Sequence, residues 1–171
     1  MPFDRAWSPT IYDKTMRHLI HLFKYGNKTA LRHTWSRILN EFIQYYHIPV
    51  QKFDILVPVP LHRSRQRQRG YNQAELLAQI LADQYHIPLI NRILRRRNTR
   101  NQARLSPKER WTNLQGAFKI TKPLNLNNMN ILIIDDLLTT GATAAALATL
   151  LKQAGADKVS VLTLSVTPRY R

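Results

Sequence analysis

Apolar residues along this chain fall into short continuous runs and into longer segments with helical spacing. The runs predict β-strands at residues 53–59, 88–94, 117–120, 131–134 and 157–167. Segments with helical spacing or helix-prone composition predict helices at 11–26, 29–46, 73–86 and 144–155. Strands that alternate with helices predict an α/β fold with a mainly parallel central sheet, right-handed crossovers and flanking helices.

The predicted strands begin after residue 50, which divides the chain unevenly. Residues 1–50 contain two predicted helices, each with one apolar face, and residues 51–171 contain all the predicted strands. We expect the N-terminal helical segment to pack on the core of the α/β part. There are no internal repeats and no long linker, so both parts are expected to form one structural domain.

The apolar run at 131–134 ends in two adjacent carboxylates, Asp135 and Asp136. Stability alone does not explain them, because two like charges repel and must stay solvated or bind a ligand. At the carboxyl end of a parallel strand, such groups face the crevice in which open α/β sheets bind ligands. Hydroxyls and a glycine follow at 139–143, before a helix whose first N–H groups and dipole favour a phosphate. The stretch therefore predicts a ribose 5-phosphate site.

An apolar strand that ends in acids is also typical of nucleotide hydrolases, which is the alternative for this stretch. Such a protein needs a phosphate loop of the form G-x-x-x-x-G-K-[ST]. The five glycines are at 26, 70, 116, 141 and 155, and none is followed by lysine. The sequence therefore favours the sugar-phosphate site over the nucleotide hydrolase.

Composition indicates a globular protein, with 44% hydrophobic residues and no cysteine in 171 residues. No run of 18 apolar residues is present, so we predict no transmembrane segment. The expected location is cytoplasmic, with peripheral association at the inner face of the membrane as an open alternative. The formal net charge of +16 indicates an anionic partner such as nucleic acid or pyrophosphate, although a solubilising surface is the simpler explanation.

The basic residues are concentrated between 62 and 110, and most of them are arginines. Arg63, Arg65, Arg67 and Arg69 recur at every second position, so an extended loop would present all four guanidinium groups on one side. Arginine binds phosphate oxygens in pairs of hydrogen bonds. A loop at the end of a strand with these residues predicts an anion site, and a solvated loop is the alternative.

The stretch 131–143, I-L-I-I-D-D-L-L-T-T-G-A-T, resembles the motif of type I phosphoribosyltransferases that binds 5-phosphoribosyl 1-pyrophosphate (PRPP). The resemblance implies that fold for residues 51–171, with a mobile hood loop over the reacting centre. It implies that Asp135 and Asp136 are the catalytic pair and hold the ribose 2′- and 3′-hydroxyls. The 5′-phosphate would bind a loop formed by Thr139, Thr140, Gly141, Ala142 and Thr143. Mg²⁺ would enter with PRPP, near the acidic pair, without a metal site made by the protein alone.

Three blocks narrow the resemblance to ComF-type competence proteins, phosphoribosyltransferase-like members of bacterial DNA-uptake systems. They are P-V-P-L-H-R at 58–63 with R-G-Y-N-Q-A at 69–74, the basic block at 95–120, and the acidic-pair motif. Many such proteins begin with a four-cysteine zinc ribbon, and this chain has no cysteine to form one. Thr139 stands where purine-transferring members of the superfamily have an acidic base, which makes a purine acceptor a poor fit.

The resemblance implies a protein that binds PRPP with Mg²⁺ and takes part in DNA uptake during natural transformation. Its acceptor substrate and its oligomeric state are not indicated. We expect the pyrophosphate at Leu61, His62, Arg63, Arg69 and Gly70, assisted by Arg100, Gln102 and Arg104 of a hood at 95–113. The alternative is a non-catalytic module that binds single-stranded DNA and keeps a regulatory or relic PRPP site. In either case a DNA-uptake helicase is the expected protein partner.

Overall fold

Four strands from distant parts of the chain form the centre of a parallel sheet. The computed structural model describes residues 1–25, 30–96 and 116–168. Strand β6 (Asn130–Leu138) lies between β7 (Lys158–Val166) and β3 (Ile55–Pro58), and β1 (Arg5–Trp7) pairs with β7 at the edge. The short β2 (Thr10–Ile11) continues along β7, and every one of these pairings is parallel. The predicted α/β fold with a mainly parallel sheet is confirmed.

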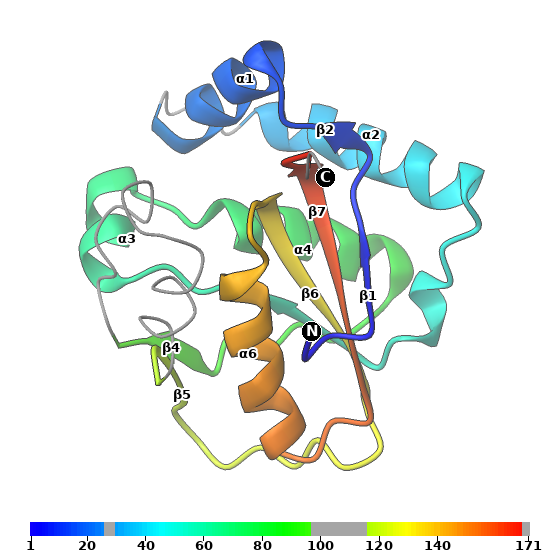
Figure 1. Cartoon of the computed structure of the whole chain (residues 1–171), viewed down its shortest axis with the longest axis vertical. Helices are drawn as coiled ribbons and strands as arrows, with labels where there is room; N and C mark the ends of the chain where they lie inside the picture. The colour runs from blue at the N-terminus through cyan, green and yellow to red at the C-terminus, as the bar shows by residue number, and fades with distance from the viewer. Residues whose placement is uncertain (26–29, 97–115, 169–171) are drawn as a thin grey trace.

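Helices cover both faces of this sheet and its carboxyl edge (Figure 1). Helix α4 (Gln73–Tyr85) packs on β3 and β6 from one side, and α6 (Ala142–Gln153) packs on β6 and β7 from the other. Helices α1 (Lys14–Tyr25) and α2 (Leu31–Tyr45) lie across the end where β6 and β7 finish. The other elements of the described residues are the 3₁₀ turn η1 (Val50–Lys52), the helix α3 (Arg63–Arg69) and an antiparallel pair, β4 (Ile93–Arg95) with β5 (Phe118–Ile120).

Two apolar cores result from the alternation of side chains along β6. Leu132 and Ile134 point into the core that contains α1, α2 and α4, and both are almost fully buried. Ile131 and Ile133 point into the core under α6 and are fully buried. A strand that is covered on both faces reads as a continuous apolar run, which explains the pattern at 131–134. No helix in the described parts of the chain is long and apolar enough to cross a membrane.

The N-terminal segment contains two helices, as predicted, but strands precede them. Residues 5–7 and 10–11 pair with β7, and this pairing had no signal in the sequence because each strand has only two or three residues. Both helices contribute buried side chains, Phe23 and Trp35 among them, to the core on the α4 side. The proposed division of the chain at residue 50 stays a prediction.

The arginine-rich segment is a helix, so the expectation of an extended loop at 61–70 was wrong. The His62 side chain caps the first turn of α3, and Gly70 ends the helix in the left-handed conformation with φ 80°. Residues two apart on a helix differ in direction by about 200°. Arg63 and Arg67 are consequently exposed, whereas Arg65 and Arg69 are half-buried.

Three other boundaries differ from the prediction. Strand β6 continues to Leu138, so the acidic pair lies inside the strand and not after it. The strand expected at 88–94 is confined to β4, with an isolated bridge at Leu89 before it. The expected hood at 95–113 begins in β4 with Arg95. Arg100, Gln102 and Arg104 lie outside the described residues.

Gly155 follows α6 in a conformation that a side chain would disturb. Its φ is 103°, and a Cβ would overlap Oδ1 of Asn127 and lie 3.2 Å from the Asn127 backbone nitrogen. We expect Gly155→Ala to lower the free energy of unfolding by about 2–4 kcal/mol in urea titrations. Gly116→Ala is the control, because Gly116 has φ 67° but nothing near its Cβ position, and about 1 kcal/mol is expected there. Equal losses at both positions would contradict the steric argument.

Candidate functional site

A cleft of about 220 Å³ lies at the carboxyl ends of β3 and β6. Its lining is mostly polar and carries both signs of charge. It consists of Lys24, Val59, Leu61, Arg65, Arg69, Asn72, Gln73, Ala74, Arg95, Asp135, Asp136, Leu137, Thr139 and Thr143. The cleft brings together the acidic pair, two threonines of the predicted phosphate loop and two residues of the predicted pyrophosphate segment, Leu61 and Arg69. The other predicted residues of these groups, among those described, are not part of its lining.

The two carboxylates of the pair have different surroundings. Asp136 is buried, and its Oδ2 lies 2.9 Å from Nζ of Lys24, which comes from the last turn of α1. Asp135 is half-buried, and its Oδ1 accepts a hydrogen bond of 2.8 Å from the Asp136 backbone N–H. The sequence did not indicate Lys24, because a single lysine at the end of an amphipathic helix has no distinguishing pattern.

Burial and the neighbouring negative charge of Asp136 raise the pKa of Asp135 to about 7, although Lys24, the Asp136 N–H and Arg95 act in the opposite direction. Burial alone would lower the pKa of Lys24, but attraction to Asp136 and the hydrogen bond between them outweigh it, so that pKa is raised. Lys24 therefore stays charged at neutral pH and neutralises one of the two acids.

The loop after β6 leads into the N-terminus of α6. Gly141 is the N-cap residue with φ 77°, and the Thr140 hydroxyl accepts a hydrogen bond of 3.4 Å from the Ala142 N–H. The first N–H groups of a helix have no partner within the helix, and its dipole favours an anion there. Thr139 and Thr143 line the cleft on either side of Gly141. The loop has the polarity expected for a phosphate site.

The motif R-G-Y-N-Q at 69–73 fixes the opposite wall of the cleft. Asn72 caps α4 through the Ala74 N–H at 3.1 Å and donates to the Val59 carbonyl at 3.1 Å, which ties α4 to the end of β3. The Arg69 guanidinium donates to the Tyr25 hydroxyl at 2.8 Å and to Oε1 of Gln73 at 3.0 Å. Much of its hydrogen-bonding capacity is thus used within the protein.

The predicted pyrophosphate residues divide into separate groups. His62 caps α3 and contacts the Ser64 hydroxyl at 2.8 Å, so its ring has a structural role. Arg63 is exposed, and Gly70 ends α3. Their assignment to pyrophosphate stays a prediction. Arg65 also lines the cleft, although no sequence pattern distinguished it from the other arginines of α3.

Arg95 is a further cleft residue that the sequence did not single out, since it precedes a run of other basic residues. It is buried, with its guanidinium 5.7 Å from the centre of the Phe118 ring. Burial and repulsion from Arg65 lower the pKa of Arg95 to about 10, while Asp135 acts in the opposite direction. At neutral pH it remains a cation. Arg65 and Arg95 therefore place two positive charges beside the acidic pair.

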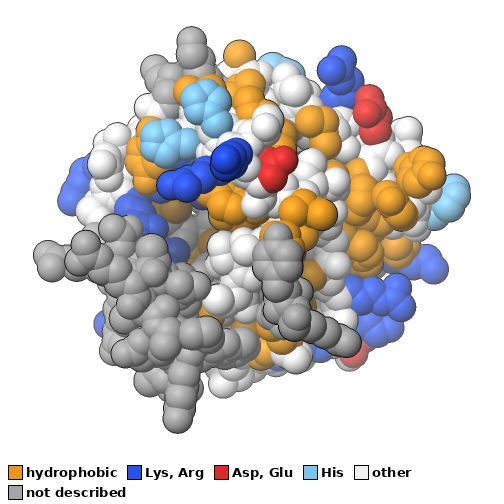
Figure 2. Space-filling view, turned by 45° about the horizontal axis from the view of Figure 1, so that its top comes forward, with side chains coloured by type: hydrophobic (Ala, Val, Ile, Leu, Met, Phe, Trp, Pro, Cys, Tyr) orange, Lys and Arg blue, Asp and Glu red, His pale blue; other side chains and the backbone are white. Residues whose placement is uncertain are grey.

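Basic side chains are spread over much of the molecular surface. On the face in Figure 2, Lys, Arg and His side chains are distributed across the described residues and acidic side chains are sparse. The net charge of +16 for the whole chain agrees with this view. Such a surface attracts anions from solution, and salt screens the attraction.

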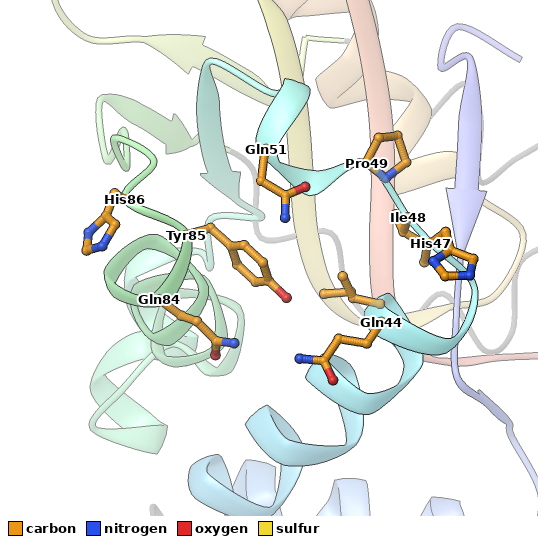
Figure 3. Close-up of a pocket in the computed structure, with 9 residues that line it drawn as sticks. Gln44, His47, Ile48, Pro49, Gln51, Gln84, Tyr85 and His86 are labelled. Carbon is orange, nitrogen blue, oxygen red and sulfur yellow. The ribbon is translucent and has the colours of Figure 1, made fainter.

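A larger cavity, of about 630 Å³, lies away from the acidic pair. It is formed by the ends of α2 and α4 and by η1, at the end of the sheet where β3 begins (Figure 3). Amides, two histidines and a tyrosine make up its polar lining, and no acidic residue, lysine or arginine is among the lining residues. These groups do not offer the combination of carboxylates and cations that a sugar phosphate with a metal requires. The smaller cleft is therefore the candidate site.

The fold and the cleft define an α/β protein with an acidic pair, a helix N-terminus and several cations at one sheet edge. The chain is 33% identical over 156 residues to Competence protein F of Haemophilus influenzae, covering 88% of this chain and 67% of that protein. It is 33% identical over 171 residues to the DNA utilization protein YhgH of Escherichia coli, covering 97% and 74%. Competence protein ComFC of Bacillus subtilis is 37% identical over 155 residues, covering 90% and 60%. The chain belongs to this ComF family of competence proteins.

No protein-family model matches the sequence. Among solved structures, a purine phosphoribosyltransferase from Pyrococcus horikoshii superposes with a TM-score of 0.43 at 21% identity. The superposition covers 81% of this chain and 76% of that one.

Proposed function

We propose that this protein binds PRPP together with Mg²⁺ in the cleft and acts as a phosphoribosyltransferase-like component of DNA uptake. The observation that carries the proposal is the meeting of Asp135 and Asp136 with the N-terminus of α6 in one cleft. Carboxylates accept hydrogen bonds from sugar hydroxyls, and a helix N-terminus binds a phosphate. The two features together match the two ends of a ribose 5-phosphate.

The remaining groups of the cleft suit the pyrophosphate and its metal. Arg65 and Arg95 provide positive charge at the wall that faces the acidic pair. The described residues include no cluster of three or more His, Cys, Asp or Glu side chains that could hold a metal alone. Mg²⁺ commonly binds through one or two carboxylates and the phosphates of the substrate. Asp135 and Asp136 fit that arrangement, and the bound ion supplies charge neutralisation for the leaving pyrophosphate.

Positioning and electrostatic stabilisation are the contributions that these residues can make to a transfer of the phosphoribosyl group. The carboxylates hold the sugar, the α6 loop holds the 5′-phosphate, and the arginines stabilise negative charge on the departing oxygen. Thr139 has no carboxylate for proton abstraction, so we propose an acceptor that needs no acidic base at this position. The names of the relatives, competence and DNA utilization, support a place in DNA uptake, with a DNA-uptake helicase as the proposed partner.

Calorimetry with PRPP, ribose 5-phosphate and inorganic pyrophosphate, each with and without Mg²⁺, tests the proposal. We expect PRPP with Mg²⁺ to bind more tightly than either fragment, because it engages both halves of the cleft. A screen of acceptors for pyrophosphate release then tests for turnover. Failure of PRPP to bind, or PRPP binding no tighter than pyrophosphate alone, would reject the site.

Binding of single-stranded DNA is a second candidate function, and the division of arginines on α3 favours it. Arg63 and Arg67 are exposed on the outer side of the helix, whereas Arg65 and Arg69 line the cleft. Outward arginines on a protein of net charge +16 are available to a phosphate backbone without competing for PRPP. Helix α3 would then contribute arginines both to the PRPP site and to a DNA-binding surface.

Arg63→Ala with Arg67→Ala is expected to weaken binding to a single-stranded oligonucleotide. Arg67→Ala alone, which lies outside the predicted pyrophosphate group, should leave PRPP binding within about twofold. Each phosphate contact contributes about −0.7 to the slope of log affinity against log salt, so the double variant should flatten that slope by about 1 or more. Fluorescence anisotropy at several salt concentrations measures it. The control is Arg5→Ala with Arg17→Ala, two exposed arginines that are not on α3. An equal loss in both double variants would indicate general surface charge in place of a DNA site on α3.

A further inference from the structure

The last turn of α1 is attached to the cleft by side chains from the 69–73 motif. The Tyr71 hydroxyl donates to the Phe23 carbonyl at 2.5 Å, and the Gln73 amide lies 3.5 Å from the carbonyls of Phe23 and Lys24. The last carbonyls of a helix have no partner within it, so these side chains satisfy the end of α1. Arg69 adds a hydrogen bond to Tyr25 and stacks over its ring at 4.6 Å. Residues at the junction of α3 and α4 thus hold the last turn of α1.

With α1 attached in this way, the Lys24 side chain lines the cleft. The Lys24 side chain is 21% exposed and that of Asp136 is 10% exposed, and their charged atoms are 2.9 Å apart. Lysine is rarely buried, because removing an ammonium from water is costly unless an opposite charge compensates it. Lys14 at the beginning of the same helix is exposed, as is usual. Surface solubility does not explain a largely buried lysine that pairs with one carboxylate of the proposed sugar site.

We propose that Lys24 is a positioning residue of the sugar site, which holds the Asp136 carboxylate in the orientation that accepts a ribose hydroxyl. The inference rests on the proposed function of the cleft. The ammonium occupies Oδ2, and a carboxylate has about four lone-pair positions, so acceptor capacity remains for the sugar. Helix α1 is then a wall of the binding site and not only a cover of the core.

Repulsion between the two adjacent acids gives Lys24 a second effect on the same site. Without a nearby cation, two carboxylates on consecutive residues disfavour each other's charged form. Lys24 reduces the net charge of the pair while leaving both side chains in the cleft. The Asp136 carboxylate can then accept a hydrogen bond from a sugar hydroxyl.

Lys24→Gln, Lys24→Arg and the control Lys14→Gln distinguish this role from general stabilisation. Calorimetry with PRPP, ribose 5-phosphate and inorganic pyrophosphate, all with Mg²⁺, is the measurement. We expect Lys24→Gln to weaken PRPP and ribose 5-phosphate by about tenfold or more and to leave pyrophosphate within about twofold. Lys24→Arg should restore most of the affinity, and Lys14→Gln should bind like the wild type.

Unchanged sugar binding by a folded Lys24→Gln variant would overturn the proposal. An equal loss for all three ligands would also overturn it, because that result indicates a structural role. If the wild type itself binds no PRPP, the assignment of the cleft fails first, and the two failures are thus distinguishable.

Lys24→Met combined with Asp136→Asn removes both charges together. This double variant provides the test if Lys24→Gln does not fold. The proposal predicts that this double variant binds PRPP as weakly as Asp136→Asn alone, since Lys24 acts through Asp136. A further loss in the double variant would show that Lys24 contributes independently of that carboxylate, contrary to the proposal. Thermal melting of each variant shows whether the compared proteins are folded.

Discussion

Replacement of both Asp135 and Asp136 by asparagine is expected to weaken PRPP binding by at least about 100-fold. Hydrogen bonds to charged groups contribute about 1.5–3 kcal/mol each, and the double variant loses two such acceptors and their share of Mg²⁺. Calorimetry with PRPP and Mg²⁺ measures the effect. Asp157→Asn is the matched control, because Asp157 is exposed at the opposite edge of the sheet, next to the start of β7.

The two acids should differ when they are replaced one at a time. Asp136→Asn leaves Lys24, which is 21% exposed, without its partner and is expected to lower the free energy of unfolding by about 3 kcal/mol. Asp135→Asn removes no ion pair of this kind, so its effect on PRPP binding can be measured in a stable protein. If PRPP affinity is unchanged in Asp135→Asn and in the folded double variant, the acidic pair is not part of a PRPP site.

A second large effect is expected in the pH dependence of stability. The pKa of Asp135 is raised to about 7 in the folded protein from an ordinary value of 3.8. Between these values the folded protein holds a proton on Asp135 that the unfolded chain releases. Unfolding then releases protons, so the free energy of unfolding falls as the pH rises from about 4 to about 7. The full loss is on the order of 4 kcal/mol and is complete above the folded pKa.

Asp135→Asn isolates this contribution, because asparagine cannot lose a proton. We expect the variant to be more stable than the wild type at pH 8, with the difference shrinking or vanishing at pH 4. Urea titrations of both proteins without Mg²⁺ at several pH values provide the comparison. Subtracting the two curves cancels the contributions that both proteins share. One of these is that of Asp4, whose depressed pKa acts in the opposite direction at low pH. A constant difference across this range would contradict a raised pKa.

The strands that carry the cleft could be predicted because they combine an unbroken apolar run with a polar end. Ile131 to Ile134 are buried on both faces of the sheet, which is the condition that produces such a run. The position of the acidic pair at the carboxyl edge follows from the same pattern. The bounds of β6 were wrong because the ladder with β7 continues past the acids to Leu138, and main-chain pairing does not depend on side-chain polarity.

The conformation of α3 and the role of Lys24 could not be predicted, each for its own reason. Arginines at every second position are the pattern expected on one face of an extended segment. The cap at His62 and the left-handed Gly70 stabilise a helix there. Lys24 reaches Asp136 from the last turn of α1, which Tyr71 and Gln73 contact through hydrogen bonds. Contacts between residues so distant in sequence have no local signature.

The pairing of β1 and β2 with β7 affects the order in which a newly made chain assembles. Arg5 is matched with Ser160, so β1 stays unpaired until β7 has been translated. Contacts between such distant segments form late, because closing a long loop costs conformational entropy before the stabilising contacts are made. Helix α1 directly follows these strands and takes its place over the cleft with them. A chain without β7 would therefore lack the Lys24 wall, and the PRPP binding that we propose would depend on the pairing of β1 and β2 with β7.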